Sequence, residues 1–213
     1  MSRPRVLLAD DHRMVAEALK GLLEAEFELV AVVEDGHQLV EAARRLRPDV
    51  IVADITMPHL NGIDALTQLK RDNAEVRVVF LTMHKDTAYA RRALDAGARG
   101  YVLKHSAPAE LVLAVRAALE GKTFITPTLA GDIFHDLKGG SKPAMNPVAA
   151  LTPRQCEILQ LFAEGFGTKE IASKLDISPR TVEFHKYQLM DSLKLQSSAE
   201  LIHFAIKNGI VAV

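Results

Sequence analysis

Residues 50–58 read Val-Ile-Val-Ala-Asp-Ile-Thr-Met-Pro, and this stretch decides the fold. An apolar run leads directly into the carboxylate of Asp54, and Pro58 then turns the chain. A short apolar run bounded by turn residues is typical of a strand buried on both faces of a parallel sheet. We therefore expect Asp54 at the carboxyl end of a central strand, the edge where open α/β sheets bind ligands.

Apolar strands and amphipathic helices alternate along residues 1–122. Strands are predicted at 6–9, 29–33, 50–54, 76–81 and 100–103, and helices at 12–26, 39–46, 63–70, 87–96 and 108–120. Such alternation predicts a parallel sheet with helices on both faces and right-handed crossovers. The predicted class is therefore α/β, a doubly wound, five-stranded, flavodoxin-like sheet of order 2-1-3-4-5.

This strand order brings polar side chains to one edge of the sheet. They follow the first, third, fourth and fifth strands, and they are Asp10, Asp11, Asp54, Thr82 and Lys104. Clustered carboxylates repel one another, and Mg²⁺, which prefers oxygen ligands, relieves that repulsion. A carboxylate can also attack phosphorus to form an aspartyl-phosphate, whose oxygens the metal, the lysine and the threonine could cover.

Taken singly, these residues have simpler structural interpretations. The acidic pair could cap the first helix, Lys104 could be a solvated charge, and Thr82 could be an ordinary strand residue. Their joint occurrence favours the functional interpretation. His12 and His84 lie near the same edge, and we expect them to be loop residues without a catalytic role.

Residues 123–149 are predicted to be a linker. A short amphipathic helix is indicated within it by the apolar residues Leu129, Ile133, Phe134 and Leu137. The following stretch, 139–143, reads Gly-Gly-Ser-Lys-Pro. Glycine, serine and proline at this density are typical of a flexible boundary between domains.

Residues 150–213 are predicted to form an all-α domain of four helices, at 153–164, 168–175, 179–193 and 198–208. Two short helices joined by a tight turn, with Ser178 capping the second, are typical of a helix-turn-helix. From residue 151 onward, seven Lys or Arg balance seven Asp or Glu. Charge therefore gives no independent indication of DNA binding.

Composition limits the class of protein. The 213 residues carry a formal net charge of −1 and one cysteine, Cys156. An intramolecular disulfide and a zinc cluster of cysteines are excluded. No apolar run reaches the length of a membrane helix, and no signal peptide is recognisable. These features indicate a cytoplasmic protein that does not enter a membrane.

Residues 5–121 resemble a response-regulator receiver domain. The resemblance rests on the polar edge described above, together with Met57-Pro58 and Asn61-Gly62 after the central aspartate. It implies that Asp54 is the phosphoacceptor and that Lys104 pairs with the phosphoryl group. It also implies that Thr82 and Tyr101 are switch residues, which reorient on phosphorylation.

The same resemblance implies a Mg²⁺ site. Asp11, Asp54 and the backbone carbonyl of Thr56 would bind the ion, and Asp10 would assist directly or through water. The phosphoryl group would come from the histidine of a sensor histidine kinase.

Residues 150–208 resemble a LuxR-type helix-turn-helix domain, through the motifs at 151–155, 167–172 and 177–185. The chain departs from the common pattern at three positions. Gln155 replaces the usual glutamate, Thr168 replaces the common asparagine, and Glu183 stands where many members carry lysine, although glutamate is itself a known variant there.

The third helix of this domain presents candidate DNA-binding residues. Glu183, Phe184 and Tyr187 lie on one face, where a glutamate can accept from cytosine N4 and an aromatic ring can contact a thymine methyl. Phosphate contacts are predicted for Lys169, Arg180, Thr181 and Lys186. Phe184 could alternatively belong to the core, where Ile171, Val182 and Leu189 are assigned.

Together the resemblances indicate a response regulator transcription factor of the NarL/FixJ type. It would bind double-stranded DNA, as a homodimer on DNA or when phosphorylated, and it would not be an enzyme. One alternative is a phosphatase-type enzyme that uses the same carboxylate edge. The other is a DNA-binding regulator that works without phosphorylation and uses the receiver as a dimerisation module.

Overall fold

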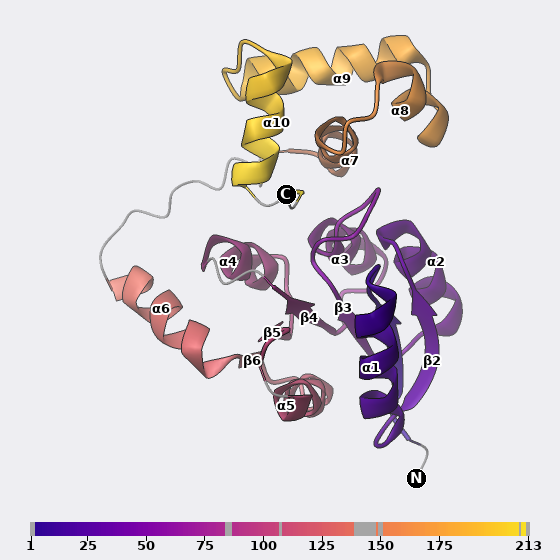
Figure 1. The fold of residues 1–213 in the computed structure, drawn as a ribbon, viewed down its shortest axis with the longest axis vertical. Coiled ribbons are helices and arrows are strands. Elements are labelled where there is room, and N and C mark those ends of the chain that lie inside the picture. The colour runs from indigo at the N-terminus through magenta and orange to yellow at the C-terminus, as the bar shows by residue number, and fades with distance from the viewer. Residues whose placement is uncertain are drawn as a thin grey trace. The chain divides into compact units, whose positions relative to one another are not determined.

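Figure 1 shows the fold in a computed structural model, which describes residues 3–83, 87–106, 108–138, 148, 151–208 and 210–211. The chain divides into two compact units, Met1–Lys142 and Pro143–Val213. We describe each unit by itself.

The first unit is built on a parallel sheet with the strand order β2-β1-β3-β4-β5-β6. Its strands are β1 (Arg5–Ala9), β2 (Glu28–Val33), β3 (Val50–Ala53), β4 (Val78–Thr82), β5 (Gly100–Leu103) and β6 (Phe124–Ile125). The predicted order of the first five strands is confirmed. The sheet nevertheless has a sixth strand, because β6 pairs in parallel with β5 through Tyr101 and Ile125.

Helices cover both faces of the sheet (Figure 1). They are α1 (Arg13–Glu24), α2 (Gly36–Leu46), α3 (Gly62–Asp72), α4 (Thr87–Asp95) and α5 (Pro108–Leu119). Alternate strand residues face opposite sides, so Val52 packs with α1 and α5, whereas Ile51 packs with α2, α3 and α4. Residues of β3 are completely buried, as predicted from their unbroken apolar run.

The first unit extends beyond residue 122 because β6 and a further helix, α6 (Pro127–Lys138), pack on it. Leu129 of α6 is buried and Ile133 packs against the cluster on the α4 side of the sheet. The amphipathic helix predicted here is present, but residues 124–138 belong to the first unit rather than to a free linker. The glycine-rich stretch at 139–143 lies outside the described residues.

The second unit contains α7 (Pro153–Ala163), α8 (Thr168–Lys174), α9 (Pro179–Ser192) and α10 (Ser198–Lys207). Local signals fix the helix starts, since Thr152 and Gln155 form a capping box and Ser178 caps α9. Ile171, Val182 and Leu189 are completely buried in one core cluster. The predicted four-helix domain and its helix-turn-helix are therefore confirmed.

No helix among the described residues is long and apolar enough to span a membrane.

Candidate functional site

Asp54 lies at the carboxyl edge of the sheet, where the end of β3 holds it in place. Its backbone N–H donates to the carbonyl of Ala9 at 2.8 Å, which continues the β1–β3 ladder by one residue. A neighbouring turn closes tightly over it, since a Cβ on Gly62 would lie 2.2 Å from the Asp54 carbonyl oxygen. Only glycine fits there, which explains why Gly62 begins the helix that follows the acidic residue.

Lys104 brings the acidic residues together. Its Nζ lies 2.6 Å from Asp54 Oδ2 and 2.7 Å from Asp10 Oδ2. The Lys104 backbone N–H donates to the carbonyl of Thr82 at 2.8 Å, so β4 and β5 position the lysine jointly. The structure thus places Asp10, Asp54 and Lys104 in direct contact, although they are scattered along the sequence.

The buried charges change one another's pKa. Burial raises the pKa of the Asp54 carboxyl, and this outweighs the lowering by the Lys104 charge and by its hydrogen bond. Burial alone would lower the pKa of Lys104, but the Asp54 charge and the hydrogen bonds to Asp10 and Asp54 raise it above its ordinary value. The carboxylates at this edge are therefore costly to ionise, and the positive charge of Lys104 offsets only part of that cost.

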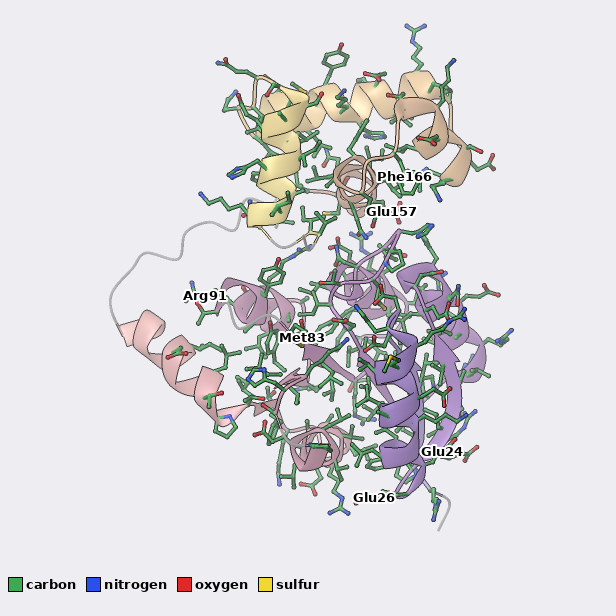
Figure 2. The ribbon with its side chains drawn as sticks, viewed as in Figure 1. Glu24, Glu26, Met83, Arg91, Glu157 and Phe166 are labelled. Carbon is green, nitrogen blue, oxygen red and sulfur yellow. The ribbon has the colours of Figure 1, made fainter. Side chains whose placement is uncertain are left out.

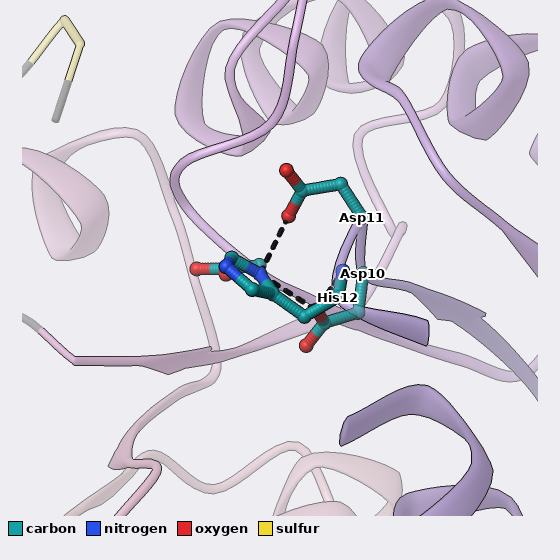
Figure 3. A group of neighbouring side chains, drawn as sticks. Asp10, Asp11 and His12 are labelled. Atoms are coloured by element: carbon teal, nitrogen blue, oxygen red, sulfur yellow. Dashed lines mark hydrogen bonds and ion pairs between the residues drawn. The ribbon is translucent and has the colours of Figure 1, made fainter. Parts of the chain in front are cut away.

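Asp11 and His12 complete the acidic cluster (Figure 3). His12 Nδ1 lies 2.8 Å from Asp11 Oδ1 and 3.4 Å from Asp10 Oδ1. One ligand atom from each of these three residues and from Asp54 lies within 4.8 Å of the others. Three carboxylates at this spacing suit a hard divalent cation such as Mg²⁺. The pairing of His12 with the acidic residues was not predicted, and His84 lies outside the described residues.

Thr56, Thr82 and Tyr101 are the remaining residues that the sequence predicts for this site. The Thr56 backbone N–H donates to Asp54 Oδ1 at 3.2 Å. Thr82 is completely buried at the end of β4, whereas the next residue, Met83, is exposed. Tyr101 is also completely buried, and it packs in the cluster that α4 and α6 share. Tyr101, which is predicted to reorient on phosphorylation, therefore already occupies an inward position in this structure.

A buried ion pair joins the two helices beside the site. Arg92 Nη2 of α4 lies 2.7 Å from Asp64 Oδ1 of α3, and both side chains are 9% exposed. The other oxygen of Asp64 accepts from Asn61 Nδ2 at 2.7 Å. The sequence contains no local pattern for this pair, because its members are 28 residues apart.

A second unpredicted contact ties the end of β5 to the start of α6. The buried hydroxyl of Thr126 accepts from the Leu103 backbone N–H at 3.2 Å and donates to Glu110 Oε2 at 2.9 Å. Leu103 directly precedes Lys104, so this contact lies one residue from the acidic site.

The predicted DNA-binding face is partly open. Phe184 and Tyr187 of α9 are 57% and 68% exposed, so Phe184 is not a core residue. Lys169 and Arg180 are exposed as well, and Thr181 is half-buried.

Two predicted contact residues on α9 have partners inside the unit. Glu183 Oε1 accepts from Thr168 Oγ1 at 2.5 Å, and Lys186 Nζ lies 5.0 Å from the centre of the Phe162 ring.

Comparisons with known proteins cover both units. Residues 6–116 match the response regulator receiver domain family, and residues 149–205 match the luxR family of bacterial regulatory proteins. Oxygen regulatory protein NreC of Staphylococcus epidermidis is 34% identical over 215 residues, which cover 97% of this chain and 99% of NreC.

Two solved structures of RcsB are similar along nearly the whole chain. RcsB from Salmonella enterica serovar Typhimurium, bound to promoter DNA in the presence of the phosphomimetic BeF₃⁻, has a TM-score of 0.62 and 29% identity, covering 95% of this chain and 98% of that one. The structure of two RcsB dimers bound to two parallel DNAs has a TM-score of 0.59 and 28% identity, covering 97% and 99%.

Proposed function

Because the chain belongs to the response regulators of the NarL/FixJ type, which are transcription factors, we propose that phosphorylation of Asp54 controls its binding to DNA. The observation that carries this proposal is the contact of Lys104 with both Asp54 and Asp10 at the carboxyl edge of the sheet. Lys104 lies close enough to Asp54 for its ammonium group to pair with the oxygens of a phosphoryl group on that residue.

In the proposed transfer, an oxygen of Asp54 attacks the phosphorus of a phosphohistidine on a sensor kinase. The O–P bond forms while the P–N bond breaks, and the histidine leaves with the electron pair of that bond. Lys104 and the Thr82 hydroxyl then face the new negative charge. Mg²⁺, held by the carboxylates of Asp10, Asp11 and Asp54 and by the Thr56 carbonyl, would supply positive charge for the transferred group.

The proposed switch begins when Lys104 exchanges its carboxylate partners for phosphoryl oxygens. Thr82 would follow, since its carbonyl accepts from the Lys104 backbone N–H. The change reaches α6 through the Leu103–Thr126 contact, and it reaches α4 through the cluster around Tyr101. The proposed result is a homodimer whose α9 helices enter two successive major grooves of double-stranded DNA, in the bacterial cytoplasm.

Phosphorylation can be tested with the purified chain, acetyl phosphate and Mg²⁺. We expect a mass increase of one phosphoryl group, which disappears in Asp54→Asn and when EDTA removes the metal. Asp132→Asn is the matched control, because Asp132 is exposed on α6 and is not a member of the acidic cluster. A full mass increase in Asp54→Asn would refute the assignment of the phosphoacceptor.

DNA binding is tested by measuring the affinity for a selected duplex with and without the phosphoryl donor. We expect phosphorylation to raise the affinity of the parent chain and of Asp132→Asn, but not of Asp54→Asn. Equal affinity in both states, together with dimers that form without the donor, would instead support a regulator that works independently of phosphorylation.

A further inference from the structure

We propose that Thr168 and Glu183 act as one unit that selects cytosine in the DNA half-site. This inference rests on the proposed binding of α9 in the major groove. The starting observation is the hydrogen bond from Thr168 Oγ1 to Glu183 Oε1 at 2.5 Å, which joins the first residue of α8 to α9. Thr168 and Glu183 are also two of the three positions where this chain departs from the common LuxR-type pattern. The two departures therefore lie in contact.

The contact fixes a side chain that would otherwise be mobile. A glutamate on a helix surface has several rotamers, and holding one of them during binding costs conformational entropy. The Thr168 hydroxyl occupies Oε1, and Glu183 is half-buried against α8. Within the part of the chain that the structure describes, Oε2 has no hydrogen-bonding or charged partner. The carboxylate thus has one engaged oxygen and one oxygen free to accept.

The chemistry of a carboxylate then selects the base. A carboxylate only accepts hydrogen bonds, and in the major groove only the amino groups of cytosine and adenine donate. Adenine also presents the N7 acceptor beside its amino group, which repels a second oxygen, whereas cytosine presents N4 alone. Guanine and thymine present acceptors, so they repel the carboxylate. Cytosine is the base that leaves no acceptor facing Glu183.

Two exposed aromatic residues lie near Glu183 in the sequence of α9. Phe184 and Tyr187 are exposed on the same helix and offer apolar contacts rather than positive charge. The carboxylate is itself repelled by phosphates, so it lowers the affinity for DNA of any sequence while it raises the discrimination between bases. A residue that recognises a base in this way lowers the overall affinity for DNA and raises the preference for one base. A residue that contacts phosphate raises the affinity for DNA of any sequence.

Thr168→Val removes the hydroxyl and keeps the shape of the side chain. The start of α8 should remain intact, because the Gly167 backbone N–H donates to Glu170 Oε2 at 2.8 Å, without help from Thr168. Thr168→Ser restores the hydroxyl and is the conservative rescue. Gln188→Ala, at an exposed position of α9, is the control for a change on the same helix.

The experiment is selection of bound duplexes from a randomised library by the full chain, untreated and treated with acetyl phosphate and Mg²⁺. We expect the parent chain, Thr168→Ser and Gln188→Ala to select a cytosine at one fixed position. Thr168→Val should weaken that preference about fivefold, and Glu183→Gln about tenfold. Glu183→Gln should also bind random DNA more tightly than the parent chain.

Two results would overturn the inference. One is selection of the same cytosine, with the same preference, by Glu183→Gln and Thr168→Val. The other is that the parent chain selects a DNA site in which no cytosine preference is lost when Glu183 is replaced. Failure of the phosphorylation switch is distinguishable from both, because it appears as identical selection by untreated and treated protein, whatever base is selected.

Discussion

Replacing Arg92 by methionine should destabilise the receiver unit, because it leaves Asp64 buried without its cation. Arg92 Nη2 lies 2.7 Å from Asp64 Oδ1, and each side chain is 9% exposed. Methionine preserves most of the apolar stem of arginine while removing the charge. Asp64 would keep its hydrogen bond from Asn61 and the favourable start of α3, but it would lose its ion-pair partner.

The expected cost is large for a single substitution. Breaking a buried ion pair by removing one partner typically costs about 3–5 kcal/mol, since the remaining charge stays in a poorly solvated place. Replacing both partners, as in Asp64→Leu with Arg92→Met, should restore most of that loss, because the desolvation of two charges disappears together. Arg91→Met is the matched control, since Arg91 projects from the adjacent position of α4 (Figure 2) and should cost less than about 0.5 kcal/mol.

Urea unfolding followed by far-ultraviolet circular dichroism measures this effect. With a slope of about 2 kcal/mol per molar, Arg92→Met should lower the midpoint of the receiver transition by roughly 1.5–2.5 M. Hydrogen exchange of residues 62–72 and 87–95 assigns the transition to α3 and α4. A loss below about 1 kcal/mol, or a double variant as unstable as Arg92→Met, would refute the reasoning that the charge of Asp64 is buried and compensated.

Three further predictions concern the acidic edge and the helix caps. The pKa of Asp54 is raised from 3.8 by burial, so this group's contribution to stability is present at low pH and is lost as the pH rises through the folded pKa. Asp54→Asn should therefore raise the urea midpoint at pH 7.5, and this gain should shrink towards pH 4. Lys104→Met should lower the midpoint at pH 7.5, because Asp10 and Asp54 then face each other without a cation, and added Mg²⁺ should recover part of the loss. Thr152→Ala should destabilise the second unit by about 1 kcal/mol, seen as faster hydrogen exchange in α7, because Gln155 N–H loses its cap.

The sequence predicts the receiver fold well because strong local signals agree with one another. The unbroken apolar run of β3 indicates burial on both faces, and Asp54 at its end follows from the chemistry of parallel sheets. The helix starts at Thr152 and Ser178 are likewise local, since each cap and its partner lie within three residues. The alternation of strands and helices placed Lys104 and Thr82 at the same edge as Asp54, and the family resemblance then supplied their roles in phosphorylation.

The unpredicted features depend on contacts between distant segments. β6 is only two residues long, and a two-residue strand has no periodicity to detect. The Arg92–Asp64 pair and the Thr126–Leu103 contact each join residues more than 20 positions apart, so only the assembled fold reveals them. His12 was expected to be an ordinary loop residue. Its pairing with Asp11 was not predicted, because it depends on a side-chain orientation that sequence spacing does not determine.

The position of Thr126 bears on how the receiver unit reaches the DNA-binding unit. Thr126 is the residue before α6, and it is bonded to β5 through both its backbone N–H and its hydroxyl. A displacement of Lys104 would therefore act on the start of α6 through the backbone N–H of Leu103. Thr126→Val keeps the shape of the side chain but removes the hydroxyl. It should leave phosphorylation of Asp54 intact while weakening its effect on DNA affinity. Unchanged regulation in this variant would show that the signal leaves the receiver elsewhere, with α4 as the remaining route.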